Sequence, residues 1–155
     1  MNEPSGFPPF KPAEANFERL VREQFAHAGL IAHMGAWLID ATPGRVVVEL
    51  PYSDRIGEGD GLFHAAIVGA LAESAASFAA QTLLPAAVRA KTLEYKINLL
   101  QPARGQILRA TGEILRLDQT LTVARAAVEV LGGLADGPCA ALQATITRDT
   151  ADGRA

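Results

Sequence analysis

The chain has one cysteine, Cys139, among its 155 residues. A single cysteine excludes an intramolecular disulfide and a multi-cysteine metal centre, and it fits a reducing compartment. Cys139 directly follows Gly137 and Pro138 and opens an apolar segment, so we interpret it as a small buried side chain rather than a nucleophile. The first ten residues lack a basic stretch followed by an apolar one, which argues against a signal peptide. We therefore expect a cytoplasmic protein.

Charge is also scarce. Charged residues make up 20% of the chain and the formal net charge is -3, which excludes nucleic-acid binding through bulk positive charge. The apolar region 62–90 is too rich in alanine, and too interrupted by Glu73, Gln81 and Pro85, to be a membrane span. A chain of this length builds one core without help from a metal. We expect no nucleic-acid partner, no membrane partner and no metal site.

Proline, glycine and apolar spacing divide the chain into elements. Four prolines within residues 1–12 predict an extended N-terminal arm, and one domain follows over 13–150. Spacings of three and four residues indicate helices, β-branched apolar runs indicate strands, and Thr42-Pro43-Gly44 predicts a hairpin turn. The predicted elements are a helix over 13–28 that stops at Gly29, strands over 31–41 and 45–50, a helix over 62–80, and four strands after Pro85.

The four strands after Pro85 follow from strict alternation of apolar and polar residues. Leu93, Tyr95, Ile97 and Leu99 illustrate the pattern, and turns short enough for antiparallel neighbours separate the segments. The helix over 62–80 is apolar nearly all round, so protein has to cover most of its surface. The sequence therefore predicts an α+β fold: a six-stranded antiparallel sheet wrapped around a central apolar helix, plus an N-terminal helix. Six strands barely suffice to cover this apolar helix, and a second copy of the chain would complete its cover.

Glu73 is the only formal charge in the run from Leu62 to Ala80. A glutamate in an apolar segment is rare unless it has a partner or a function. Ser77 lies one turn further along the helix and Ser74 lies beside Glu73, so the helix has hardly any polar face. We interpret Glu73 as a functional carboxylate; simple exposure to water is the alternative.

The start of this helix resembles a motif of the hotdog-fold thioesterases, in particular their phenylacetate-pathway and 4-hydroxybenzoyl-CoA branches. That motif reads Gly, two residues, His-Gly-Gly, four variable residues, an apolar residue, one more, then Asp or Glu. The positions in register with it are Gly61, His64, Leu71 and Glu73. Ala65 and Ala66 replace the two motif glycines, and the segment 92–105 resembles the family's strand and following turn. The likeness covers about residues 29–148.

The resemblance implies an acyl-CoA thioesterase, with coenzyme A as part of the substrate and no separate cofactor. It assigns the base or nucleophile to Glu73, and the backbone N–H that polarises the thioester carbonyl to Ala65. An alanine still donates this N–H, while its methyl group predicts a narrower acyl pocket. Ser77 matches a hydroxyl that holds water or substrate, or else it bonds to its own helix backbone. His64 orients the loop, and Gly61 belongs to its substrate-binding part.

Glu58 stands six residues before His64, where these families often carry Asn or Gln. Its carboxylate either enters the site or points to solvent, and the sequence leaves both possibilities open. The segment 85–125 carries seven Lys and Arg against three Asp and Glu, and such cations suit phosphate oxygens. The cations expected to contact the phosphates of coenzyme A are Arg89, Lys91, Arg104 and Arg116.

His64 and Glu73 are nine residues apart, which on one helix means roughly 13 Å along the axis and opposite sides. One carbonyl group therefore cannot contact the His64 end of the helix and Glu73 of the same chain. We therefore expect a homodimer whose two sites are each built from both chains, in agreement with the family, and leave the pairing of dimers into tetramers open.

Two other functions are considered. A non-catalytic hotdog protein that binds acyl-CoA or another apolar ligand is favoured by Ala65, Ala66 and Glu58. A hotdog dehydratase or hydratase requires a His and an acid arranged for β-proton transfer, and the sequence has neither an Asp-to-His pair five residues apart nor a proline-rich loop after a His.

Overall fold

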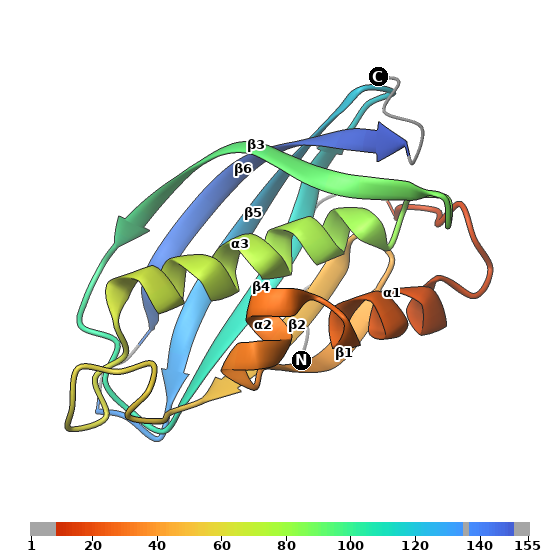
Figure 1. Cartoon of the computed structure of the whole chain (residues 1–155). Coiled ribbons are helices and arrows are strands. Elements are labelled where there is room, and N and C mark those ends of the chain that lie inside the picture. Colours follow the sequence, from red (N-terminus) through yellow and green to blue (C-terminus); the bar gives the residue numbers. More distant parts are fainter. Residues whose placement is uncertain (1–8, 135–136, 151–155) are drawn as a thin grey trace.

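The computed structural model describes residues 9–134 and 137–150. Six strands form one antiparallel sheet in the order β1-β2-β4-β5-β6-β3, which curves around the helix α3 (Figure 1). The elements are α1 (Phe17–Ala26), α2 (Gly29–Met34), β1 (Trp37–Thr42), β2 (Arg45–Pro51), α3 (Ala65–Gln81), β3 (Val88–Leu99), β4 (Ile107–Leu117), β5 (Leu121–Leu131) and β6 (Pro138–Thr150). The predicted fold class is confirmed.

The alanine-rich sequence of α3 allows the helix to lie very close to the sheet. α3 packs against β2 to β6, and its fully buried alanines include Ala72, Ala75 and Ala76. Below them lies Gly112 of β4, where a Cβ atom would stand only 2.1 Å from the backbone oxygen of Ala75. Only a residue without a side chain fits at this point of the sheet. Small residues on both surfaces therefore set the distance between helix and sheet.

The N-terminal part differs from the prediction. Residues 31–36 are not strand: α2 occupies 29–34 and β1 begins at Trp37. Ile31 is the only β-branched residue in this stretch, and alanine and methionine favour a helix. Gly29 begins a helix rather than ending one, and Gly35, with φ +83°, ends it in the left-handed conformation. The first helix is also shorter than predicted, because it begins at Phe17.

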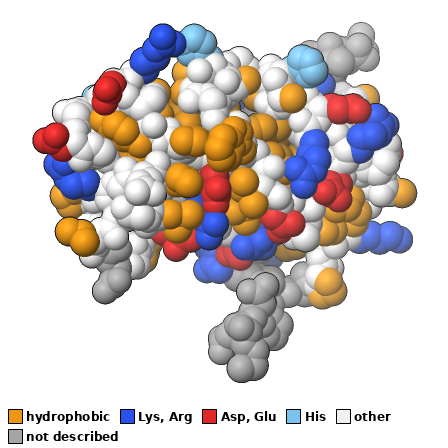
Figure 2. Space-filling model, turned by 90° about the horizontal axis from the view of Figure 1, so that it is seen from below, with side chains coloured by type: hydrophobic (Ala, Val, Ile, Leu, Met, Phe, Trp, Pro, Cys, Tyr) orange, Lys and Arg blue, Asp and Glu red, His pale blue; other side chains and the backbone are white. Residues whose placement is uncertain are grey.

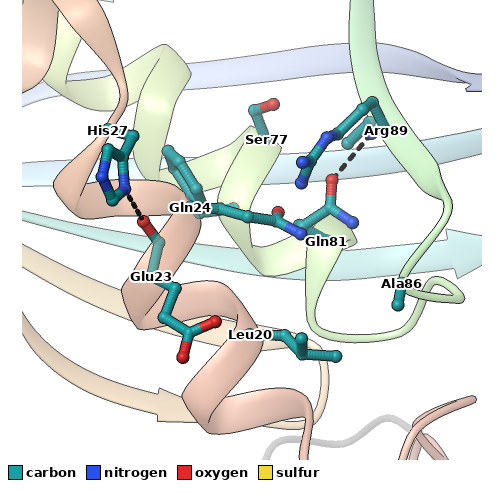
Figure 3. A pocket seen from close by; sticks show the side chains of 10 residues that line it. Leu20, Glu23, Gln24, His27, Ser77, Gln81, Ala86 and Arg89 are labelled. Carbon is teal, nitrogen blue, oxygen red and sulfur yellow. Dashed lines mark hydrogen bonds between the residues drawn. The ribbon is translucent and has the colours of Figure 1, made fainter. Parts of the chain in front are cut away.

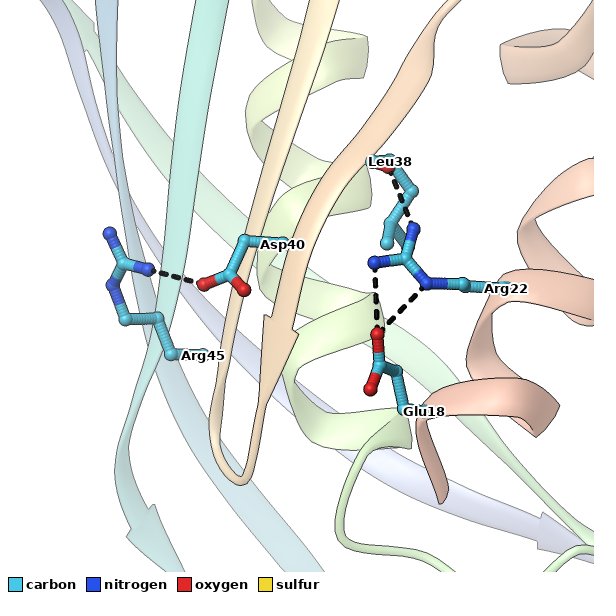
Figure 4. Close-up of polar contacts among 5 residues, drawn as sticks. All are labelled: Glu18, Arg22, Leu38, Asp40 and Arg45. Atoms are coloured by element: carbon cyan, nitrogen blue, oxygen red, sulfur yellow. Dashed lines mark hydrogen bonds and ion pairs between the residues drawn. The ribbon is translucent and has the colours of Figure 1, made fainter. Parts of the chain in front are cut away.

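α1 is fixed to the sheet edge and to α3 by a few specific contacts. The Arg22 guanidinium donates to the Leu38 carbonyl of β1 at 3.0 Å and to the Glu18 carboxylate at 3.0 and 3.1 Å (Figure 4). Phe25 packs edge-on against Phe78 of α3, with ring centroids 5.1 Å apart. α1 and α2 thus cover part of α3 that the sheet leaves open. Figure 2 shows the molecule from below the view of Figure 1, with hydrophobic side chains gathered near the middle of this face and charged side chains around them.

The predicted hairpin and the later strands are confirmed. Pro43 and Gly44 form the turn between β1 and β2, with Gly44 at φ +79°. Apolar residues of β4, β5 and β6 are buried as predicted, but those of β3 are not: Leu93, Tyr95 and Leu99 are about half exposed. β3 lies at the edge of the sheet, and among the described strands only β6 pairs with it.

Three remaining predictions concern the ends and the single cysteine. Most of the arm over 1–12 lies outside the described residues, and the domain bounds stay a prediction; Phe10 packs against the core. Cys139 is buried, as predicted, and burial raises the pKa of its thiol. Within 9–134 and 137–150, none of the helices has the length and apolar character needed to cross a membrane.

Candidate active site

His64 caps the N-terminus of α3. Its backbone is extended (ψ 138°), and its Nδ1 accepts a hydrogen bond from the Ala66 N–H at 3.0 Å. The N–H groups of Ile67 and Val68 donate to the His64 carbonyl. The Ala65 N–H has no acceptor among the described residues, and Ala65 is exposed. The donor to which the resemblance points is therefore free, at the end of a helix where a developing negative charge is stabilised.

The loop before α3 places Glu58 next to His64. Glu58 Oε1 lies 3.7 Å from His64 Nε2, and both side chains are about half exposed. Gly61 adopts φ +73° and its carbonyl accepts from the Gly105 N–H at 3.0 Å, which ties the loop to the segment after β3. Glu58 and Ala65 line one cavity of about 380 Å³, together with Leu99, Leu100 and the buried Cys139. Glu58 thus borders the cavity while about half of its side chain remains exposed to solvent.

Glu73 lies in the middle of α3 and is half-buried. The Thr92 hydroxyl of β3 donates to Glu73 Oε1 at 2.5 Å, and no cation pairs with Glu73 in the described chain. The carboxylate borders a cavity of about 230 Å³ between α2 and α3, whose other walls are mainly apolar and include Leu30 and Ile31. Glu73 is thus a carboxylate held by one neutral donor over an apolar space, and simple exposure to water does not describe it.

Ser77 lines two cavities. It lines the Glu73 cavity and also a cavity of about 640 Å³ between α1, α3 and the start of β3 (Figure 3). Its hydroxyl has no hydrogen-bond partner among the described residues, whereas Thr82, one turn on, does bond back to its helix, at the Ala79 carbonyl. The backbone alternative for Ser77 is therefore not observed, and its hydroxyl is available to a ligand.

The four predicted phosphate-binding cations do not form one cluster. Arg89 lines the cavity beside Ser77, and Lys91 Nζ stands 3.9 Å from Asp149. Arg104 donates to the Asp60 carbonyl at 2.5 Å, near the start of α3. Arg116 binds both carboxylate oxygens of its neighbour Asp118, a hydrogen-bonded pair that lowers the pKa of Asp118 and raises the pKa of Arg116.

The structure therefore separates the predicted site residues into two groups. Ala65, His64 and Glu58 surround the N-terminus of α3, whereas Glu73 and Ser77 lie further along it, and the cavities of the two groups share no lining residue. Sequence reasoning missed Thr92, which holds Glu73. The only feature of the sequence that could have indicated Thr92 is its hydroxyl group, in the first half of the strand that follows the helix and within the segment that resembles the family.

Comparison with known proteins agrees with this fold. A solved thioesterase family protein of Silicibacter pomeroyi is 31% identical, and the match covers 86% of this chain and 98% of that one, with a TM-score of 0.81. A thioesterase structure of Haemophilus influenzae is 19% identical over 88% of this chain and 92% of its own, with a TM-score of 0.74, and so is similar in fold. A curated Halobacterium salinarum protein named as a proposed esterase is 29% identical over 122 residues, 76% of this chain and 80% of its own. The thioesterase superfamily model matches residues 60–134, and the chain belongs to this superfamily, with its hotdog fold.

Proposed function

We propose that the protein hydrolyses acyl-CoA thioesters, with Glu73 as base or nucleophile and the Ala65 N–H polarising the carbonyl. Membership of the thioesterase superfamily, and a relative named as a proposed esterase, support hydrolysis of a thioester or ester. The observation that carries the proposal is the state of Glu73: a half-buried carboxylate bound by the Thr92 hydroxyl, without a cation, over an apolar cavity. A carboxylate without a paired cation is free to act as a base or a nucleophile.

Hydrolysis requires that the Glu73 carboxylate and the Ala65 N–H act on the same thioester carbonyl group. The carbonyl oxygen accepts from the Ala65 N–H, which stabilises the negative charge that develops there. Glu73 either removes a proton from an attacking water or attacks the carbonyl carbon itself, and in the second case water then hydrolyses the anhydride that forms. In both routes a C–O bond replaces the C–S bond, and the sulfur leaves as the thiolate of coenzyme A. Ser77 holds the water or the substrate, and His64 keeps the start of α3 in place.

A homodimer in which two β3 strands pair antiparallel supports this chemistry. In the described part of the chain, one edge of β3 is unpaired and its Leu93, Tyr95 and Leu99 side chains are exposed. An exposed strand edge with apolar side chains is suited to pairing with a strand of another chain. The Thr92 contact places Glu73 beside the first half of β3, whereas the Ala65 cavity is lined by Leu99 at its far end. A two-fold axis across β3 reverses the partner strand, so Glu73 of one copy approaches the partner's cavity at the start of α3. Pairing of two such dimers is left open.

Among the cations, Arg104 and Lys91 are proposed to contact the phosphates of coenzyme A. Arg104 lies at the loop before α3, close to where the thioester would bind. Lys91 keeps only a distant partner in Asp149. Arg116 is less available because Asp118 already neutralises it. Arg89 lies instead at the cavity between α1, α3 and β3.

The experiment is a thiol-release assay on aromatic and fatty acyl-CoAs with two variants. Glu73→Gln removes the carboxylate. Ala65→Pro replaces the N–H with a ring CH2 group and should leave the helix intact, because proline is accepted at the first helical position and His64 already has the extended backbone that precedes a proline. We expect each variant to lose at least about a hundredfold in kcat while keeping the fold.

Mixing the two variants tests the shared site. If each site uses Glu73 of one copy and Ala65 of the other, refolded or co-expressed mixtures regain about a quarter of wild-type activity, since half of the dimers then carry one intact site. A mixture that stays inactive contradicts a site built from two chains. Binding of acyl-CoA by the wild type without any thiol release would instead indicate a non-catalytic binding protein.

A further inference from the structure

The cavity of about 640 Å³ between α1, the second half of α3 and the start of β3 contains neither Glu73 nor Ala65 in its lining. It adjoins the Glu73 cavity, because Ser77 and Phe78 line both. Along α3, Ser77 lies about 6 Å beyond Glu73 and Gln81 about 12 Å beyond it. An acyl group whose carbonyl carbon lies at Glu73 can therefore extend past Ser77 into this second cavity.

The two cavities differ in chemistry. The space next to Glu73 is lined by apolar residues such as Leu30 and Ile31, which suits methylene groups. The second cavity contains a cation, Arg89, whose side chain turns over Gln81 toward Ser77 (Figure 3). The Arg89 guanidinium makes no hydrogen bond or ion pair with any residue in the described part of the chain, and a guanidinium is a strong donor to a carboxylate. Along α3, the cavity lining is thus apolar near Glu73 and cationic near Arg89.

The neighbours of Arg89 are already committed to other contacts. The Gln81 amide donates to the Val88 carbonyl at 2.8 Å and accepts from the Ala90 N–H at 2.9 Å, which fixes the start of β3 on either side of Arg89. Glu23, the carboxylate that lines this cavity, is bound by Arg19 at 2.6 Å. Asp149, opposite Arg89 on β6, has its carboxylate 3.9 Å from Lys91 Nζ. None of these groups forms an ion pair with the exposed Arg89 side chain, which is therefore accessible to a ligand carboxylate.

We propose that Arg89 binds a carboxylate at the far end of the acyl group, so that the preferred substrates are thioesters of dicarboxylic acids with a medium-length chain. This inference rests on the proposed function, since it takes the reacting carbonyl to lie at Glu73. The methylene chain lies in the cavity between α2 and α3, and the terminal carboxylate accepts from the Arg89 guanidinium. The cavity thereby selects substrates by their far end.

The experiment compares adipoyl and hexanoyl thioesters, which have the same number of carbons and differ in the terminal carboxylate. Each acyl group is supplied on coenzyme A and on N-acetylcysteamine, which lacks the phosphates. We expect kcat/KM to favour adipoyl by about tenfold or more on both carriers. Arg89→Gln is expected to remove this preference, whereas Lys96→Gln, which removes a cation from the same strand outside this cavity, keeps it.

The alternatives give different results. If Arg89→Gln lowers kcat/KM equally for both acyl groups, and only on coenzyme A, then Arg89 binds a phosphate and the proposal is wrong. Equal rates for adipoyl and hexanoyl thioesters in the wild type also overturn it. If no thioester is hydrolysed, the proposed function fails by itself, and calorimetry with adipate and hexanoate decides: binding of adipate alone, lost in Arg89→Gln, supports the carboxylate site, and no binding of adipate refutes it.

Discussion

Gly112→Ala tests whether the close contact between α3 and the sheet holds the fold and the site together. A Cβ atom at position 112 would lie 2.1 Å from the Ala75 oxygen and 2.6 Å from the Ala76 nitrogen, and both are backbone atoms of α3 that no side-chain rotation can move away. The helix or the strand has to shift by about 1 Å, in a core packed at crystal-like density. Overpacking of a core commonly costs about 1–3 kcal/mol, and a clash with backbone lies at or above the upper end. We expect a loss of about 3 kcal/mol.

The measurement is urea and thermal unfolding of Gly112→Ala beside Gly29→Ala. Nothing lies within 4 Å of a Cβ atom at Gly29, and Gly29 is in a helix, so alanine there should leave stability unchanged or raise it by up to about 1 kcal/mol. For a chain of this size the expected loss in Gly112→Ala corresponds to a Tm lower by roughly 10 °C. Because α3 carries Glu73, kcat should also fall. Equal stability of the two variants would mean that α3 does not lie on Gly112.

Three further predictions concern single contacts. Thr92→Val removes the donor to Glu73 and should lower kcat about tenfold in the thiol-release assay, while Thr92→Ser keeps most activity. Arg109→Leu leaves Glu49, whose side chain is only 11% exposed, without the two N–H groups that bind it, and should lower the free energy of unfolding in urea by about 2 kcal/mol. Burial raises the pKa of the Cys139 thiol, so the thiol should stay unreactive toward a disulfide reagent until the protein unfolds. Above the ordinary pKa of 9.0 the unfolded chain loses the thiol proton while the folded chain still keeps it, so the free energy of unfolding should fall as pH rises.

Apolar periodicity predicted the strands well where a strand lies between two neighbouring strands and packs against α3. In β4, β5 and β6 every second residue faces α3, so apolar alternation directly reports the core face. The same alternation in β3 reports something else. Leu93, Tyr95 and Leu99 keep the pattern of a buried face and yet are about half exposed, because β3 is the sheet edge and no segment among residues 9–134 and 137–150 covers them. Sequence alone cannot distinguish a face buried within one chain from one available to a second chain.

The short helix α2 was not predictable from pattern because it has only six residues, less than two turns, and a single buried side chain, Ile31. Its place over α3 nevertheless forms one wall of the Glu73 cavity. Contacts between segments distant in sequence, such as Thr92 with Glu73, depend on the register of β3 against α3. A bulge between Thr92 and Glu94 sets that register, and nothing in the local sequence specifies it.

Glu73 shows what separates a predictable residue from a predictable site. Its isolation in an apolar helix made it stand out in the sequence. Its nine-residue separation from His64 on one helix predicts that a site using both ends of the motif takes them from two chains. Within one chain the structure keeps these two groups in cavities that share no lining residue. A carboxylate and a donor on separate cavities cannot act on one carbonyl, so either the site forms between two copies at the β3 edge or the chain binds without catalysis. Complementation between Glu73→Gln and Ala65→Pro decides between these, because only a shared site regains activity when two inactive chains combine.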